Sequence, residues 1–171
     1  LALAVAGGPA VPWPAQAGTV TIAVSGDAAP GGGTFTSFDA PALNNLGQAA
    51  FLANQSDPVN NHGIYRGDGG AVALIVRAGA AAPGGGTFTN LSSPALNNLG
   101  QAAFFAFQSD PINNTGIYRG DGGAVAKLAR AGDAAPGGGT FTSLGAPALN
   151  NLGQAAFFGS QSDPVNNSGI Y

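Results

Sequence analysis

The sequence predicts an all-β fold in which three tandem 53-residue units each form a four-stranded antiparallel sheet. The first observation is the repeat, because Pro30–Thr36 returns as Pro83–Thr89 and again as Pro136–Thr142. The second observation is that short apolar runs alternate with clusters of Gly, Pro, Asn and Asp, without a persistent helical period. A fixed period of this length is typical of proteins in which each repeat is one supersecondary unit.

The second unit shows the expected order of strands and turns. The expected strands are Val72–Arg77, Thr87–Thr89 leading to Pro94–Leu96, Gln101–Phe107 and Gly116–Tyr118. The Asn-Asn-Leu-Gly sequence before Gln101 predicts a tight turn, because Asn and Gly tolerate left-handed conformations. An Asp-Pro-Ile-Asn-Asn loop joins the last two strands, and Arg-Gly-Asp-Gly-Gly predicts a hairpin turn into the next unit. Four strands per unit is the content of one propeller-type blade.

The repeat register divides the chain into an apolar N-terminal extension, residues 1–17, and three units, residues 18–70, 71–123 and 124–171. The third unit stops at Tyr171, where the earlier units turn into a further apolar strand. Thr19–Ser25 is an additional copy of that strand near the start of the chain. We therefore expect the third sheet to lack its last strand and Thr19–Ser25 to act as a donor strand.

The expected recipient of the donor strand is another copy of the chain, because closed rings usually contain about four to eight blades. Two arrangements remain open, namely a closed ring such as two chains with six blades, and a head-to-tail contact that grows a fibre. An unpaired sheet edge would otherwise promote aggregation. The expected assembly residues are Trp13, Val20, Ile22, Val24, Ile170 and Tyr171.

The extension Leu1–Ala17 has two interpretations. It is apolar and ends in Ala-Gln-Ala, like a secretory signal and its cleavage site, although it lacks the basic residues that open such a signal. Alternatively it is an inter-subunit arm, which at ~3.3 Å per residue would reach about 55 Å. Trp13, between two prolines, would anchor that arm on a partner. No apolar run reaches the ~20 residues of a membrane-spanning helix.

The motif Asn44-x-x-Gly47-x-x-Ala50-Phe51 recurs from Asn97 and from Asn150. It resembles the tandem N-x-x-G-x-x-A-F repeat of bacterial exported proteins, and the flanking Gly-Ile-Tyr-Arg-Gly-Asp-Gly is similar to that family as well. The resemblance covers roughly residues 18–171. It implies propeller-blade-like repeats, often with varied C-terminal surface anchors, and it implies no particular activity. More distantly, Pro-x-x-Asn-x-x-Gly with Ala-Ala-Phe and Ile-Tyr is similar to Tol-type β-propeller blades.

The composition excludes several classes of protein. With 44% hydrophobic residues the chain can bury a core, yet only 8% of its residues are charged, against about 25% in an ordinary soluble domain. A net charge of -3 without a basic patch argues against nucleic acid as a partner. The absence of cysteine excludes disulfides and thiolate metal sites. Together with the signal-like start, this composition favours an extracellular or cell-surface location.

The polar residues recur at equivalent positions, whereas catalytic sites are asymmetric, so we predict no enzymatic activity and no cofactor. One Asp per unit precedes Pro and an Asn pair, and it has two interpretations. Such residues cap turns by bonding to backbone amides, or their oxygens bind calcium. The calcium candidates are Asp57, Asn60, Asp110, Asn113, Asp163 and Asn166. A single carboxylate per loop favours turn capping, because a calcium loop normally supplies more.

Three further motifs have simple structural interpretations. His62 is the only histidine, and Thr115 and Ser168 replace it in the other units, so we expect a loop residue. The two Arg-Gly-Asp tripeptides precede Gly-Gly and predict hairpin turns rather than an adhesion motif. N-glycosylation sequons are possible glycan sites. They lie at Asn54, Asn90, Asn113 and Asn166.

We therefore expect a secreted, non-enzymatic structural repeat protein that self-assembles by strand donation into a filament or surface layer. Its partner would be another copy of itself. The alternative is a propeller-like module that binds carbohydrate or cell-surface ligands as a closed oligomer.

Overall fold

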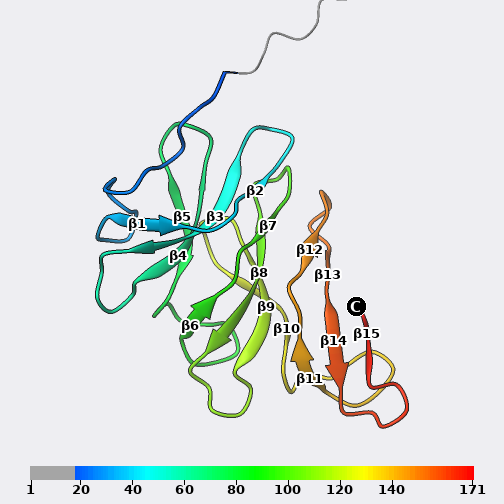
Figure 1. Cartoon of the computed structure of the whole chain (residues 1–171). Coiled ribbons are helices and arrows are strands. Elements are labelled where there is room, and N and C mark those ends of the chain that lie inside the picture. The colour runs from blue at the N-terminus through cyan, green and yellow to red at the C-terminus, as the bar shows by residue number, and fades with distance from the viewer. Residues whose placement is uncertain (1–17) are drawn as a thin grey trace, which may run out of the picture.

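The computed structural model describes residues 18–171, and within that range it contains strands and turns but no helix. The expected arm and Trp13 lie outside the described residues. Two five-stranded antiparallel sheets are followed along the chain by a three-stranded and a two-stranded sheet, and the last two together are called sheet 3 below (Figure 1). The prediction of an all-β protein built from repeated antiparallel sheets is confirmed; the sheets do not close into a propeller.

Sheet 1 contains five strands in the order β1-β3-β4-β5, with β2 also paired to β3. Its strands are β1 (Phe35–Phe38), β2 (Ala42–Leu43), β3 (Ala49–Gln55), β4 (His62–Gly67) and β5 (Ala73–Arg77). β1 pairs with one end of β3 and β2 with the other, through Phe35 opposite Gln55 and Ala42 opposite Ala50. The two short strands therefore act together as one interrupted edge strand, which gives the four-stranded meander that the sequence predicts.

Sheet 2 repeats this topology one unit later in the order β10-β9-β8-β6, with β7 paired to β8. Its strands are β6 (Phe88–Leu91), β7 (Ala95–Leu96), β8 (Ala102–Gln108), β9 (Thr115–Gly120) and β10 (Ala126–Arg130). As expected, the strand that follows each Arg-Gly-Asp-Gly-Gly turn completes the preceding sheet, because β5 pairs with β4 and β10 with β9. Each sheet boundary thus falls one strand after the sequence-repeat boundary.

Sheet 3 is smaller and has the order β11-β14-β15, beside a separate β12-β13 pair. Its strands are β11 (Phe141–Leu144), β12 (Ala148–Leu149), β13 (Ala155–Ala156), β14 (Phe158–Gln161) and β15 (Ser168–Ile170). Phe157 and Tyr171 exchange two backbone hydrogen bonds of 3.0 Å, which continue the pairing beyond β15. Within residues 18–171, β15 pairs only with β14, so sheet 3 has no counterpart of β5 and β10.

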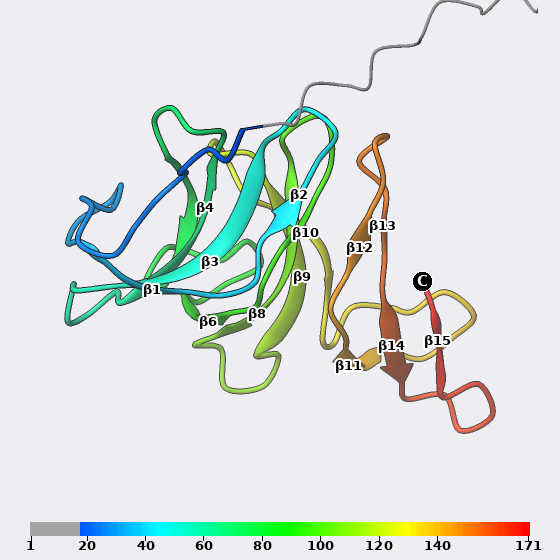
Figure 2. The ribbon, with the colours of Figure 1, turned by 45° about the horizontal axis from the view of Figure 1, so that its top comes forward.

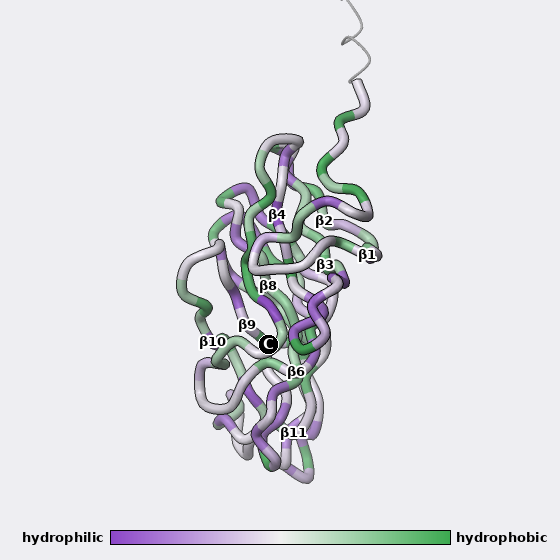
Figure 3. The backbone as a smooth tube through the Cα atoms, turned by 90° about the vertical axis from the view of Figure 1, so that its left-hand side faces the viewer, coloured by the Kyte–Doolittle hydropathy of each residue, from purple (hydrophilic) through white to green (hydrophobic). Residues whose placement is uncertain are grey.

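The core of each unit is built around two Phe rings and one Tyr ring at equivalent positions. In the first unit, Phe35 and Tyr65 meet edge to face with ring centroids 4.9 Å apart, and Phe51 packs beside both. The corresponding pairs in the later units, Phe88–Tyr118 and Phe141–Tyr171, show the same separation of 4.9 Å. Apolar positions are distributed along all three sheets, as the hydropathy-coloured tube in Figure 3 shows. Each unit therefore has its own aromatic cluster, while the buried cluster around Phe88 and Tyr118 also contains Ala50 and Ile64 of the first unit.

Candidate assembly surfaces

Thr19–Ser25 belongs to no strand in this chain, although it occupies the place on the first unit that β5 occupies on the second. A methyl group built on Gly67 would lie 2.8 Å from Cγ2 of Ile22, and one built on Gly120 would lie 3.1 Å from Cγ2 of Ile75. Ile22 and Ile75 are equivalent repeat positions, as are the two glycines. The segment is thus placed against the first unit, and among residues 18–171 its other side has no strand partner.

The turn after the segment repeats the turn after β5. The Asp27 N–H donates to the Val24 carbonyl at 3.2 Å, as the Ala80 N–H donates to the Arg77 carbonyl at 3.2 Å. Gly26 has a φ of 96° at the third position of the first turn, a conformation that favours glycine. The Gly26 N–H then donates to the Phe35 carbonyl at 2.9 Å. This turn fixes the end of Thr19–Ser25 in the geometry of a β5-type strand.

Sheet 3 exposes apolar side chains that the other units bury against a neighbour. Ile64 and Ile117 are 0% exposed, whereas Ile170, at the equivalent position, is 74% exposed. Ala50 and Ala103 are buried, whereas Ala156 is exposed. Phe158 is 48% exposed, and its counterparts Leu52 and Phe105 are partly buried against the following unit. We call Ala156, Phe158 and Ile170 the tail patch.

The first unit has a complementary exposed surface on its opposite side. Phe38 is 37% exposed, whereas its counterparts Leu91 and Leu144 are 4% and 8% exposed. A hollow of about 310 Å³ lies between Thr19–Ser25 and this unit. Its apolar walls are Val20, Ile22, Ala23, Phe38, Pro41, Ala49 and Phe51. We call this feature the head hollow.

Asparagine side chains connect neighbouring units in a ladder. The buried Asn97 side chain accepts the Leu99 and Gln101 N–H groups through Oδ1, each at 3.0 Å, and Nδ2 donates to the Asn150 carbonyl at 3.0 Å. Asn44 makes the same contacts one unit earlier, and its Nδ2 donates to the Asn97 carbonyl at 2.9 Å. Consecutive tight turns are therefore held side by side at one end of the sheets, near β2 and β12 (Figure 2) and near β7, which Figure 1 labels.

The third unit also contains a buried acceptor without a partner. The Tyr65 and Tyr118 hydroxyl groups donate to Oε1 of Gln55 and Gln108 at 2.8 and 2.9 Å. Oε1 of Gln161, the third member of the series, is buried and has no hydrogen-bond partner in the part of the chain that the structure describes. Tyr171, which would supply the donor, is only half-buried. The polar core of the third unit is therefore incomplete at the edge that lacks an outer strand.

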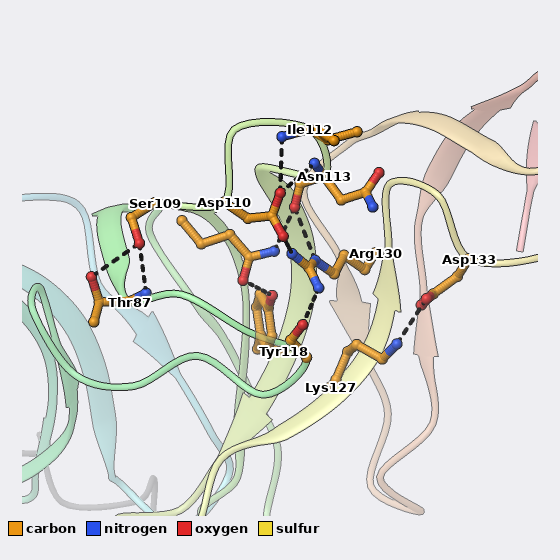
Figure 4. A network of polar contacts seen from close by, with 11 residues as sticks. Thr87, Ser109, Asp110, Ile112, Asn113, Tyr118, Lys127, Arg130 and Asp133 are labelled. Carbon is orange, nitrogen blue, oxygen red and sulfur yellow. Dashed lines mark hydrogen bonds and ion pairs between the residues drawn. The ribbon is translucent and has the colours of Figure 1, made fainter.

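The aspartates of the Asp-Pro loops cap turns. In the second unit, Oδ1 of Asp110 accepts the Ile112 and Asn113 N–H groups at 2.8 and 3.0 Å (Figure 4). Oδ2 of Asp110 lies 2.6 Å from Nη2 of Arg130, whose Nε also donates to the Asn113 carbonyl at 2.9 Å. The N–H groups of Asn113 and Ile112, then the guanidinium, lower the pKa of Asp110. Asp57 and Asp163 accept the equivalent backbone N–H groups, and their pKa values are lowered for the same reason.

The calcium candidates are thus occupied by internal hydrogen bonds. Asn60, Asn113 and Asn166 supply backbone carbonyls to the neighbouring Gln55, Gln108 and Gln161 side chains. In the described part of the chain, no three His, Cys, Asp or Glu side chains gather as potential metal ligands. Turn capping accounts for the Oδ1 contacts of these aspartates, while Oδ2 of Asp57 and of Asp110 faces Arg77 and Arg130.

The arginines of the Arg-Gly-Asp motifs bind the following unit, because Arg66 donates to the Gly100 carbonyl and Arg119 to the Gly153 carbonyl. The prediction that His62 is a loop residue is wrong, because His62 is the first residue of β4, where it pairs with Asn54. It is half-buried, and burial lowers its pKa. Among the sequon asparagines, Asn54, Asn90 and Asn166 are exposed and Asn113 is half-buried.

The fold and these surfaces define the class of the molecule, a tandem-repeat all-β protein whose sheets contact one another in series. The chain belongs to a family of unknown function, DUF7453, whose family model matches residues 9–171. Comparisons with curated proteins and with solved structures gave no match. Between residues 18 and 171 there is no helix long and apolar enough to cross a membrane.

The sequence alone did not predict the asparagine ladder or the head hollow. The repeated Asn-Asn pair was the available signal for the ladder. The tight turn alone gave a sufficient reason for these asparagines, so the sequence did not indicate a second role between units. The head hollow includes Phe38. Its counterparts Leu91 and Leu144 are buried by the preceding unit, and the sequence does not show that this position depends on a neighbouring unit for its burial.

Proposed function

We propose that this protein is a non-enzymatic structural subunit that self-assembles by β-strand donation, in which Thr19–Ser25 of one copy pairs with β15 of another. The observation that carries the proposal is that Thr19–Ser25 lies on the first unit as β5 lies on the second, with an outer side that pairs with no strand of residues 18–171. β15 offers the matching unpaired edge. Strand addition of this kind gains main-chain hydrogen bonds along both edges.

The internal sheets define the register of the proposed joint. β4 pairs with β5 through Gly63 opposite Arg77, Ile64 opposite Val76 and Tyr65 opposite Leu74. Shifted by the repeat, these pairs become Gly169 opposite Val24, Ile170 opposite Ala23 and Tyr171 opposite Thr21. The Ala78 N–H donates to the His62 carbonyl at 3.0 Å, so the Ser25 N–H would donate to the Ser168 carbonyl of the partner.

The proposed setting is an extracellular filament or surface layer. A chain with 8% charged residues and no cysteine has little charge repulsion to oppose close association and no dependence on disulfides. Repeated contact between one end of a copy and the other end of the next is heterologous, so it forms a fibre unless the rotation closes a ring.

The first test compares the intact chain with a deletion of Leu1–Ser25 by sedimentation velocity and electron microscopy. The intact chain should form fibres or closed particles as its concentration rises, and the deletion should retain its β-sheet circular dichroism but sediment as one small species. Fibres would establish an open joint, and uniform particles a closed ring. Assembly of the deletion, or an intact chain that stays monomeric at all concentrations, would contradict strand donation.

A point substitution isolates the backbone edge. Ser25 is the second residue of a turn with glycine third, where proline fits, so Ser25→Pro should leave the turn intact and remove one N–H. We expect Ser25→Pro to weaken association about tenfold, while Ser25→Ala, which retains the N–H, associates normally. Equal association of both variants would argue against this register.

Because the chain has no cysteine, introduced cysteines report the register directly. A chain with Ala23→Cys mixed with a chain with Ile170→Cys should form an inter-chain disulfide under mild oxidation. Pairing Ala23→Cys with Ser168→Cys, two positions away along β15, provides the matched control.

A further inference from the structure

The tail patch and the head hollow are the same two surfaces that meet inside the molecule, each without its partner. In the joint between the first two units, Ala50 and Ile64 form one buried cluster with Ile75, Val76, Leu91, Ala102 and Phe104, and Leu52 packs against it. Five members of this cluster are the repeat equivalents of residues that line the head hollow. Ile75, Val76, Leu91, Ala102 and Phe104 correspond to Ile22, Ala23, Phe38, Ala49 and Phe51. Ala50, Leu52 and Ile64 are the equivalents of the tail patch.

Side-chain sizes at the two surfaces match as they do inside the chain. In the first joint, Leu52 packs against a cluster that contains Val76. In the second joint, the larger Phe105 packs against a cluster that contains the smaller Ala129 at the position of Val76. The exposed surfaces carry Phe158 and Ala23, which is the pairing of the second joint. Leu52 and Val76 lie on either side of Ile64 in one sheet, and Phe105 and Ala129 lie on either side of Ile117 in the next. In the joint that contains the Phe, the larger side chain therefore shares its sheet with the smaller residue.

We infer that the tail patch of one copy docks into the head hollow of a second copy, and that Phe158 and Ala23 determine the fit of this interface. The inference rests on the proposed self-assembly and adds the side-chain surface to its backbone edge. The occupant is a second copy of this chain, because the internal joints supply both halves of the interface. Docking covers Phe158, Ile170 and Phe38, which are exposed in the single chain.

Polar groups favour the same register. In the internal joints, Nδ2 of Asn44 and of Asn97 donates to the carbonyl of the next Asn in the ladder. Nδ2 of Asn150 bonds only to Gln154 within the described residues, at 2.8 Å. When the tail patch lies in the head hollow, the second N–H of the Asn150 side chain points to the Asn44 carbonyl of the second copy. The ladder then continues across the joint without a change of spacing.

The decisive experiment is a double-substitution cycle on the intact chain, with association measured by sedimentation velocity. Ala23→Val and Phe158→Leu should each raise the concentration for half-association at least about fivefold, the first by crowding and the second by a void. The double variant has the Leu and Val pairing of the first joint, so it should return to within about twofold of the original chain. Additive losses in the double variant would overturn the assignment of these two residues.

A polar series separates docking from general surface hydrophobicity. Phe158→Ser should weaken association more than about tenfold, because it places a hydroxyl group in the apolar hollow. Phe107→Ser is the matched control, since Phe107 is 42% exposed and Ser160 stands at its position in the third unit. An equal effect of both changes would show that exposed apolar area, and not docking, drives association.

The two proposals fail in different ways. If Ser25→Pro weakens association but the Phe158 and Ala23 variants do not, the strand joint is correct and the docking inference is wrong. If the Phe158 variants weaken association and Ser25→Pro has no effect, the copies dock without strand donation. A chain that never associates would contradict both.

Discussion

Asn97 connects the second and third units, and its replacement by Asp should separate the cap of its own turn from the bond between units. An Asp at this position keeps Oδ1, which accepts the Leu99 and Gln101 N–H groups. It loses Nδ2, which donates to the Asn150 carbonyl and to Oε1 of Gln101, each at 3.0 Å. The side chain is 1% exposed, so water cannot replace these bonds.

The expected cost follows from the two lost donors. Each hydrogen bond contributes about 1 kcal/mol net, and a buried acceptor left unpaired adds about 1 kcal/mol or more. Asn97→Asp should therefore lower the free energy of unfolding by at least about 3 kcal/mol, because at neutral pH it also places a buried carboxylate oxygen against two acceptors. For a chain of this size, that change corresponds to a decrease in Tm of roughly 6–12 °C.

The repeat provides the control at Asn150. Its Oδ1 accepts the Leu152 and Gln154 N–H groups like that of Asn97, but between residues 18 and 171 its Nδ2 donates only to the exposed Gln154 side chain. Asn150→Asp should change stability by less than about 0.5 kcal/mol. Urea and thermal unfolding at neutral pH, followed by circular dichroism at concentrations where the chain sediments as one species, would measure both. Equal losses in the two variants would refute a stabilising bond between units.

Further predictions address packing, pH and the joint. Ile117→Ala should lower the unfolding free energy by about 2–5 kcal/mol, whereas Ile170→Ala, at the exposed equivalent position, should change it by less than about 0.5 kcal/mol in urea unfolding of the unassembled chain. The pKa of Asp110 is lowered from 3.8 by the Asn113 and Ile112 N–H groups and by Arg130, so its stabilisation is present above that value and is lost as pH falls through the lower pKa. Asp110→Asn should reduce the dependence of the urea midpoint on pH at and below pH 3.8. An unchanged dependence would show that ionised Asp110 does not stabilise the fold. Burial lowers the pKa of His62 from 6.5, so the fold loses stability as the pH falls below 6.5 and the unfolded chain binds a proton first. His62→Thr, which introduces the residue of the second unit, should remove this dependence of the urea midpoint on pH. Val24 occupies the repeat position of Arg77 and Arg130, of which Arg130 pairs with Asp110. Val24→Arg should therefore form an ion pair with Asp163 of a partner and tighten association about fivefold in sedimentation velocity. No change would contradict the proposed register.

The strands and turns were predictable because each unit encodes them locally. Gly47, Gly100 and Gly153 have φ values of 78°, 72° and 79°, which is the left-handed conformation that the Asn-Asn-Leu-Gly turn indicates. β8 and β9 lie within one or two residues of the predicted ranges Gln101–Phe107 and Gly116–Tyr118. Three copies of one pattern gave the same local answer three times, so the transfer of β5 and β10 to the preceding sheets could also be anticipated.

The contacts between units were not predictable from the pattern, because the side chains that make them also have local roles. Asn97 caps its own turn and binds the next unit with the same amide group, and Arg66 belongs to a hairpin turn but donates to Gly100. A sequence repeat is identical whether its units touch through one face or another. Ile117 and Ile170 occupy equivalent repeat positions but differ in solvent exposure, and the size of that difference comes from the structure alone.

The ladder between the units has a direction. At both internal joints the donors, Asn44 with Arg66 and Asn97 with Arg119, belong to the earlier unit, and the carbonyl acceptors belong to the later one. An array built from such contacts is vectorial, so its leading and trailing ends present different chemistry to solvent. In the proposed array, the two ends would elongate with different rate constants, and a molecule with only one competent face would stop growth at one end alone.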